Sequence, residues 1–372
     1  MQKKWQFLFS LAFGAIWMLC LYFTFDATLS LTQLHLSDGM TAYSPLVGSL
    51  VLTGLLLLLQ RLVQRFTRFR QSCFLLTFFP STAALVLLTS FVSGVSLFAV
   101  IVTSVLAFAW YVMAVMESFR HENVVVRPLK AASWFGQILL FFLLVFYMGA
   151  MGNSKDVYRY EVQTARLLRA GHYHEALEVG KTSLATTQYL TAMRAYAMGK
   201  IAKSLGDQLF HFPLPENSGS RSLLLLPSDS LSLLFSSDSL YRLLGVPPYD
   251  GKQSPTDYLA VAAKRHSDGA AGDYYLCALL LDKQLERFAT ELQQFYVISD
   301  TAALPAHYAE ALILYNRIHP NPSVIYENAN ITANYLDFKE KGRSISRREQ
   351  RSNLLRREYG DTYWWYYFYH GQ

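Results

Sequence analysis

Residues 45–70 read PLVGSLVLTGLLLLLQRLVQRFTRFR, and this stretch decides how the chain is organised. The run from about residue 43 to residue 60 is almost entirely apolar, and each central leucine favours membrane insertion by about 0.5 kcal/mol. About 20 such residues cross the hydrocarbon core as a helix. Arg61, Arg65, Arg68 and Arg70 follow directly. The stretch therefore predicts a transmembrane helix whose carboxyl end lies in the cytoplasm.

Four more apolar runs fill the first 151 residues, at about residues 5–25, 73–91, 96–116 and 133–151. Pro80 falls inside the run at 73–91. Proline removes a backbone donor, but inside a membrane neighbouring helices can satisfy the freed carbonyl. The sequence thus predicts five spans, with a kink at Pro80. The basic start of the first span is also typical of signal peptides, but its apolar run is too long and no small-residue cleavage site follows it.

The basic residues of this half all lie on alternate loops. They are Lys3, Lys4, Arg61, Arg65, Arg68, Arg70, Arg120, Arg127 and Lys130. The intervening loop at 26–42 carries only Asp26 and Asp38 as charged residues, and the turn at 92–95 carries none. Loops rich in Lys and Arg stay in the cytoplasm. The N-terminus is therefore predicted to be cytoplasmic, and residues 152–372 are predicted to be extracytoplasmic.

The composition changes sharply near Met151. Residues 1–151 hold four acidic and nine basic side chains, whereas residues 152–372 hold 23 acidic and 24 basic ones. The net charge of +6 thus divides into +5 and +1. A pI near 9.0 is therefore no sign of nucleic-acid binding, which needs a basic surface on the folded domain. No span carries a charged residue or a histidine near its centre, which favours an anchoring bundle over a transporter.

The half from residue 152 onward is predicted to be all-α. Cys277 is its only cysteine, so an internal disulfide is excluded and a buried, inert thiol is expected. Residues 160–184 carry Ala, Leu and Tyr at the spacing of a tetratricopeptide-type helix pair, with Gly171 at the turn. Gly206 follows 35 residues later, close to the repeat period of about 34. We therefore expect paired helices with Ala176 buried between them.

This pattern is interrupted at about residues 211–239, where Pro, Ser and Leu dominate and an ordered insertion with one short helix is expected. Helical patterns then resume. They cover residues 239–245 with 256–266, 271–281 with 285–297, and then 305–318, 326–339 and 344–358. The sequence therefore predicts a five-span helical bundle followed by a tetratricopeptide-like domain at 152–372.

This combination resembles a bacterial family of unknown function whose members are multi-pass membrane proteins with a tetratricopeptide-like tail. The resemblance rests on residues 206–212, 278–296, 304–315 and 359–369. It implies a Gram-negative inner membrane and a periplasmic tail, and it implies no activity. Members of that family often have a longer membrane region than this chain.

Motifs that carry catalysis are missing from the sequence, including the phosphate-binding loop, the nucleophile elbow, the zinc-protease helix and Cys-x-x-Cys. His172 and His174 flank a turn, but two ligands do not make a metal site, and we expect both to face solvent. Asp229 and Asp238 could pair as acid and base, but turn and cap roles fit Asp-Ser sequences better. The sequence assigns no catalytic, cofactor-binding or metal-binding residue and no cofactor.

Two functions from different classes remain. The first is a membrane-tethered scaffold that binds a protein or peptide, because helical-repeat surfaces are extended and concave. The second is a membrane enzyme of envelope polysaccharide or lipid metabolism with an accessory repeat domain. A polar cavity around Asp26, His35 or Asp38 would favour the enzyme, and an open groove on the helical domain would favour the scaffold. Since no site is visible in the sequence, the scaffold is preferred.

The C-terminus combines a basic run at 339–357 with seven consecutive aromatic residues at 363–369. Two interpretations compete. The aromatic residues could close the end of the helical domain, as terminal repeats must, with the arginines forming a solvated face. Alternatively, the tail could return to the bilayer, with basic residues at anionic headgroups and aromatic residues at the interface. We favour the first, because adjacent aromatic residues on one helix cannot all face lipid.

Overall fold

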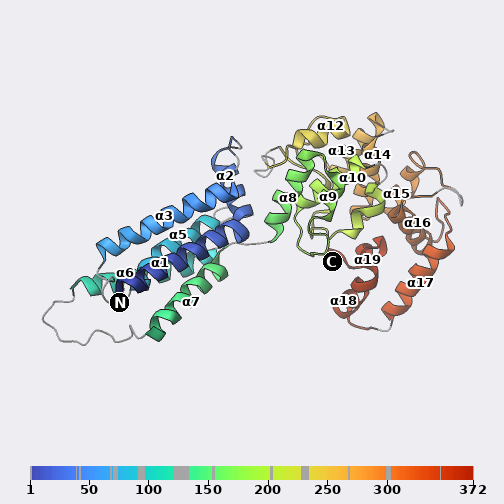
Figure 1. Cartoon of the computed structure of the whole chain (residues 1–372). Coiled ribbons are helices and arrows are strands. Elements are labelled where there is room, and N and C mark those ends of the chain that lie inside the picture. The colour runs from blue at the N-terminus through green and yellow to red at the C-terminus, as the bar shows by residue number, and fades with distance from the viewer. Residues whose placement is uncertain are drawn as a thin grey trace. The chain divides into compact units, whose positions relative to one another are not determined.

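The computed structural model describes residues 2–38, 40–41, 43–67, 69, 74–90, 97–119, 134–152, 156–201, 204–227, 234–266, 269–298, 303–343 and 345–371. These residues form helices, turns and irregular segments, and none of them lies in a strand. The predicted all-α class is therefore confirmed. The chain divides into two compact units, Met1–Arg159 and Tyr160–Gln372 (Figure 1).

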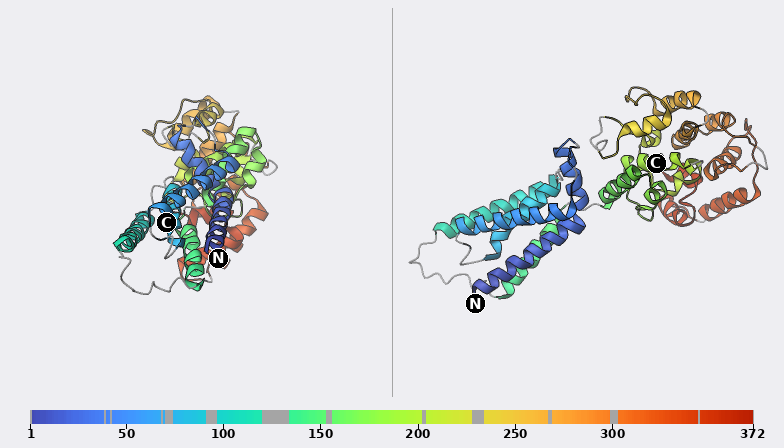
Figure 2. Two further views of the ribbon diagram at one scale, coloured as in Figure 1. Left: turned by 60° about the vertical axis from the view of Figure 1, so that its left-hand side comes forward. Right: turned by 45° about the horizontal axis from the view of Figure 1, so that its top comes forward.

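The first unit is built from apolar helices of different lengths, and the longest of them run alongside one another in Figures 1 and 2. In chain order these are α1 (Gln2–Leu19), the π-helix η1 (Cys20–Thr24), α2 (Asp26–Leu36), α3 (Pro45–Phe66), the 3₁₀ helix η2 (Phe74–Phe78), α5 (Phe79–Ser90), α6 (Leu97–Phe119) and α7 (Trp134–Met151). α3 packs against α1 and α5, and α5 packs against α6 and α7. α5 therefore occupies the middle of the bundle.

Among the described residues, three helices are long and apolar enough to cross a membrane: Lys4–Thr24, Pro45–Phe66 and Phe98–Met116. A fourth would be added if Gly136–Met151 and Asp156–Ala170 counted as one bent span. The described part of the chain thus offers three candidate spans where the sequence predicts five. Within the predicted span at 73–91 the described apolar helix, Phe74–Thr89, is shorter than the three candidates; it begins as a 3₁₀ helix and becomes α-helical at Phe79.

Pro80 lies in the first turn of α5 and has no backbone N–H. In a continuous α-helix a residue at position 80 would donate its N–H to the carbonyl of Leu76. The indole Nε1 of Trp110, on α6, donates to this carbonyl at 2.8 Å. A neighbouring helix thus contributes a donor here, and the predicted kink at Pro80 stays a prediction.

Residues 26–42, predicted as a loop, contain the helix α2. Asp26 begins this helix, where a negative charge is favoured by the helix dipole. Ala27, Leu29 and Leu31 are buried. The loop prediction was wrong because it used the absence of basic residues and overlooked the apolar residues that α2 buries against the bundle. The turn at 92–95 and the basic loop at 120–130 lie outside the described residues.

Aromatic side chains fill the core of the first unit. Phe13 stacks on Phe78 at a ring distance of 4.3 Å, and both are fully buried together with Trp17. Other large apolar side chains point outward from the same helices, such as Phe108 at 69% exposure and Phe146 at 72%. Helices that are apolar on both their inner and outer faces are typical of a membrane environment.

The second unit consists of shorter helices. These are α8 (Asp156–Ala170), α9 (Tyr173–Glu178), α10 (Gln188–Lys200), α11 (Ser204–Gln208), η5 (Leu209–His211), η6 (Gly219–Leu223), α12 (Ser237–Leu244), α13 (Pro255–Arg265), α14 (Ala270–Leu281), α15 (Leu285–Leu292), α16 (Ala306–Ile318), α17 (Ala329–Arg343), α18 (Arg348–Tyr359) and α19 (Tyr363–Tyr369). From α13 to α17, each helix packs against the next along the chain. α14 is buried along almost its whole length and forms the centre of the unit.

Tetratricopeptide repeats are not confirmed. Gly171 makes the expected turn with a left-handed φ of 79°, and Ala176 is fully buried as predicted. However, the helices expected to complete the first two repeats, α9 and α11, have only six and five residues. Gly206 is not at a turn but inside α11, where a Cβ atom would lie 2.7 Å from the Tyr308 ring. Its role is close packing against α16.

The aromatic run at 363–369 forms α19, which packs against α16 and α18. Tyr363, Trp364, Trp365 and Tyr366 are buried. This confirms that the block is mainly core. The companion expectation, that the basic run is only a solvated face, was wrong in part, because several of its side chains contact α19. Lys339 lies over the Phe368 ring, Arg356 lies over the Trp365 ring, and Arg348 donates to the Phe368 carbonyl.

Candidate functional site

The second unit contains an open cleft of about 850 Å³. Its volume lies within the range of roughly 300–1,000 Å³ that ligand sites in proteins occupy. One wall comes from residues 181–186 and 210–216, and the other from 352–361 and 365–371. Segments about 150 residues apart in sequence therefore line one cleft, and they touch where Phe210 packs on Tyr366. We call this the terminal cleft, because the chain's C-terminal residues line it.

The first wall is extended chain with an apolar character. Leu184 projects from it with 66% of its surface exposed. Pro213, Leu214 and Pro215 continue this wall after the 3₁₀ helix η5. Because prolines restrict the backbone and cannot donate from their nitrogen, this segment stays extended and does not join a helix. Lys181, at one end of the wall, pairs with Glu178 at 2.8 Å.

The second wall presents polar side chains from a helix. Asn353, Arg356, Arg357 and Gly360 follow the spacing i, i+3, i+4 and i+7 along α18 and its end, so they share one helix face. Leu355 and Tyr359 are buried on another face of the same helix. The sequence of α18 thus separates an apolar face for packing from a polar face for the cleft.

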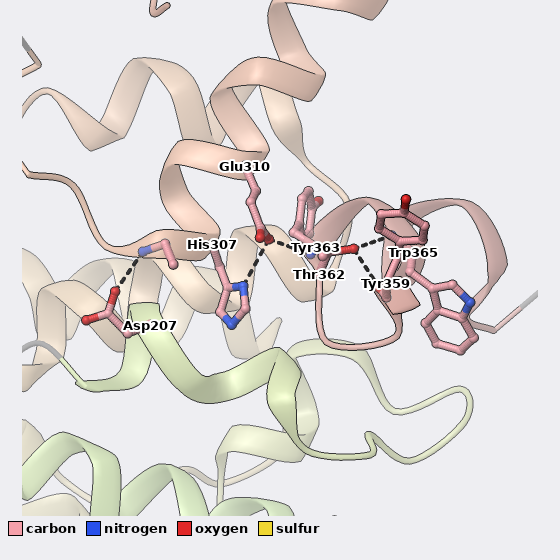
Figure 3. A network of polar contacts seen from close by, with 8 residues as sticks. Asp207, His307, Glu310, Tyr359, Thr362, Tyr363 and Trp365 are labelled. Atoms are coloured by element: carbon pink, nitrogen blue, oxygen red, sulfur yellow. Dashed lines mark hydrogen bonds and ion pairs between the residues drawn. The ribbon is translucent and has the colours of Figure 1, made fainter. Parts of the chain in front are cut away.

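A polar network fixes the start of α19 in this wall (Figure 3). Oε2 of Glu310, on α16, accepts the backbone N–H of Tyr363 at 2.7 Å and lies 3.0 Å from Nδ1 of His307. The Thr362 hydroxyl accepts from the backbone N–H of Trp365 and donates to the Tyr359 carbonyl at 2.7 Å. Figure 3 shows the Glu310 side chain reaching from α16 to the first turn of α19. The first backbone donors of α19 are therefore satisfied by side chains.

Tyrosine hydroxyls then connect α19 to the centre of the unit. The hydroxyl of Tyr363 donates to the Leu280 carbonyl at 3.2 Å, and that of Tyr366 donates to the Leu281 carbonyl at 2.8 Å. Both carbonyls lie at the end of α14, and that of Leu280 also accepts the backbone N–H of Lys283 at 3.1 Å. Phenylalanine at positions 363 and 366 would lack these hydroxyl donors, so the two tyrosines connect α19 to α14.

Two histidines line the cleft, and burial lowers the pKa of both. The pKa of His211 is lowered by burial and then by His307, whose ring lies 5.1 Å away, while Asp361 and Glu310 oppose the shift. The pKa of His370 is also lowered first by burial, while its contact with the Pro215 carbonyl and the charge of Glu216 oppose this. Asp361 therefore raises the pKa of His211 against the effect of burial, and Glu216 does the same for His370.

Two arginines, Arg356 and Arg357, also line the cleft, and both lie on α18. The Arg356 guanidinium lies 5.1 Å from the centre of the Trp365 ring, a contact that orients its plane. Among the described residues, no carboxylate lies within ion-pair distance of Arg356 or Arg357. Both side chains are exposed. Their hydrogen-bond donors are thus available to an anionic group.

The residues considered from sequence lie elsewhere. His172 and His174 are exposed at the α8–α9 turn, as predicted, and line a smaller hollow with Lys200. Asp238 is exposed in the first turn of α12, and Asp229 lies outside the described residues. Cys277 is fully buried, and burial raises the pKa of its thiol. Asp26, His35 and Asp38 belong to α2 and the turn after it, in the first unit.

Sequence reasoning missed the terminal cleft because its two walls are separated in the chain. The basic run and the aromatic run were both recognised, but neither indicates residues 181–186 or 210–216. The i, i+3, i+4 spacing of Asn353, Arg356 and Arg357 was a usable signal. Proline and leucine at 213–215 gave none, since such segments usually mark irregular connections.

Comparison with known proteins gives one match. Residues 250–370 match the model of a family of unknown function (DUF6057). This segment contains α13 to α19 and hence one wall of the terminal cleft, while the other wall precedes it. No curated protein and no solved structure matches the chain.

Proposed function

We propose that this protein is a membrane-tethered scaffold that holds a partner polypeptide in the terminal cleft, outside the cytoplasm. The observation that carries the proposal is the cleft itself, which is open, of ligand-sized volume, and lined by apolar, aromatic and charged side chains. Leu184 and the prolines offer contacts for apolar side chains, and α18 offers donors for polar ones.

The proposal retains five crossings, with a cytoplasmic N-terminus and the second unit in the periplasm of a Gram-negative bacterium. Five residues of 3₁₀ helix and twelve of α-helix in η2 and α5 extend for roughly 28 Å. The 18 residues of α7 extend for about 27 Å. Both lengths are close to the hydrocarbon thickness of about 30 Å, and small mismatches are accommodated by the bilayer. The alternation of basic loops supports the orientation.

The alternative, a membrane enzyme of envelope polysaccharide or lipid metabolism, predicts a polar cavity around Asp26, His35 or Asp38, and that cavity stays a prediction. The scaffold is preferred because the described cleft of the second unit offers both apolar and polar contacts to a polypeptide.

Site-directed photo-crosslinking in living cells tests the proposal. A photoreactive residue replaces Leu184 in the cleft wall of the full-length protein, and Val261 in a matched control. Val261 is 46% exposed on α13 and does not line the cleft. We expect a discrete, protease-sensitive adduct from position 184 only, followed by identification of one partner and the reciprocal crosslink from it.

Equal adducts from both positions, or none from position 184, would overturn the scaffold proposal. A protease-resistant adduct from position 184 would instead favour the polysaccharide or lipid alternative.

A further inference from the structure

The donors of the terminal cleft are arranged for carboxylates. Arg356 and Arg357 are adjacent on α18, and the amide of Asn353 lies one turn before them on the same face. Guanidinium groups bind carboxylates through two parallel hydrogen bonds, which makes such contacts strong and directional. The Trp365 ring under Arg356 restrains that guanidinium before any ligand arrives.

The cleft's own carboxylates do not neutralise these arginines. Asp361 is near enough to His211, and Glu216 to His370, to oppose the lowering of each histidine's pKa. Among the described residues neither forms an ion pair with Arg356 or Arg357. The arginines of α18 thus remain available to a ligand, although Asp361 follows them on the same wall.

The other lining segments mix apolar side chains, with Leu184 exposed and Pro213, Leu214 and Pro215 among them, with polar ones such as Lys181 and Glu216. An acidic sugar chain would bring carboxylates but no aliphatic side chains for these segments. A polypeptide that carries both acidic and aliphatic side chains satisfies both walls at once.

We propose that the occupant of the terminal cleft is an acidic polypeptide segment whose carboxylates bind Arg356 and Arg357 while an aliphatic side chain packs against Leu184. This rests on the proposed function and specifies its ligand.

Fluorescence anisotropy with the full-length protein in detergent micelles tests this. The probe is a labelled peptide of repeated Leu-Glu-Glu units, and its matched control replaces every Glu by Gln. We expect the Glu peptide to bind more tightly, and the double variant Arg356→Gln/Arg357→Gln to weaken it by about tenfold or more. Arg343→Gln is the matched control, because Arg343 is exposed at the end of α17 and does not line the cleft. It should leave the affinity unchanged.

The outcomes separate this inference from the scaffold proposal. Equal binding of the Glu and Gln peptides, or equal losses in the Arg343 variant and the double variant, would overturn the acidic ligand. A crosslinked polypeptide partner at position 184 would still support the scaffold in that case. Binding of an oligogalacturonate with no binding of either peptide would overturn both. A thermal melt of each variant shows that the fold is retained.

Discussion

The two units of this chain use polar side chains on backbone groups in ways that overlap only in part. In the first unit, described side chains donate to carbonyls of neighbouring helices, the Trp110 indole of α6 to Leu76 and the Ser81 hydroxyl of α5 to Leu56 of α3. In the second unit, some helix ends are closed by tertiary contacts, such as Glu310 at the start of α19 and the Tyr366 hydroxyl at the end of α14, and others are closed locally. Gly171 ends α8, and the hydroxyls of Thr187 and Thr362 cap α10 and α19.

The surroundings proposed for each unit, a bilayer for the first and water for the second, account for the local caps of the second. Inside a bilayer no water can bond to a freed carbonyl, so another part of the protein must do so. In water an end that lacks a tertiary partner is still solvated, so short local caps suffice. Polar side chains thus join helices in both units, and local caps at Gly171, Thr187 and Thr362 accompany them in the second.

The comparison fails if the first unit is not in the membrane, so topology is the prediction with the largest expected effect. A reporter that works only outside the cytoplasm should be active when fused after Gly152, and inactive when fused after Arg70 or Lys130. The expected result is all-or-none, because each fusion point lies on one side of the bilayer. Activity after Arg70 would place the cluster 61–70 outside and would refute the five-span arrangement.

The second unit should respond strongly to a charge placed between its helices. Ala176 is fully buried in α9, against α10. Ala176→Arg combines overpacking of about 1–3 kcal/mol with burial of an unpaired charge. We expect the thermal midpoint of the second unit to fall by roughly 10 °C or more in the full-length protein.

Val261→Arg is the control, because Val261 is 46% exposed on α13. It should shift the midpoint by no more than about 2 °C. If Ala176→Arg melts like the control, α9 and α10 are not packed as described.

Much of this fold could be predicted, and the failures have physical causes. Helix α16 was predicted at 305–318 and lies at Ala306–Ile318, since prolines bound the segment at both ends. The prediction of the second helices in the first two repeats was wrong because a glycine can either make a turn or permit close packing. Gly171 adopts a left-handed turn, whereas Gly206 permits close contact with Tyr308. Sequence spacing does not distinguish these uses.

The candidate site was less predictable than the fold. The aromatic block was correctly expected to be core, since adjacent aromatic residues on one helix cannot all face lipid. Its tyrosine hydroxyls bond to the end of α14, and nothing local in the sequence indicates that partner. A cleft between residues 181–216 and 352–371 depends on tertiary packing alone.

A buried carboxyl group, that of Glu161, makes the stability of the second unit depend on pH. Glu161 is fully buried on α8 and accepts a hydrogen bond from the Thr187 hydroxyl. Burial raises its pKa to about 7, and the hydrogen bond opposes this only in part. The folded state thus holds a proton that the unfolded state releases near its ordinary pKa of 4.5. The stability from this group is complete below pH 4.5 and is lost as the pH rises through about 7.

Glu161→Gln keeps the acceptor for Thr187 and cannot ionise. We expect the variant to gain about 2 kcal/mol over the wild type at pH 8, and to equal it near pH 4.5. Thermal melts of the full-length protein across this range measure the difference. Glu340→Gln, at an exposed position of α17, should show no such pH-dependent gain. Parallel pH curves for Glu161→Gln and the wild type would contradict a buried, protonated Glu161.

The smallest predicted effect concerns a hydrogen bond between two helices of the first unit. Trp110→Phe keeps an aromatic ring beside Phe69 and Phe79 but removes the donor to the Leu76 carbonyl. Side-chain hydrogen bonds between membrane helices contribute about 0.6–2 kcal/mol, and we expect a loss of about 1 kcal/mol in unfolding titrations from mild detergent into a denaturing one. Tyr111→Phe is the control, because Tyr111 is 60% exposed on the same helix.

Pro80→Ala should reduce the loss, since an alanine at position 80 can donate its own N–H to Leu76 and makes the indole dispensable. If Trp110→Phe costs the same in the Pro80→Ala background, the indole stabilises the bundle through packing and the carbonyl of Leu76 has another partner.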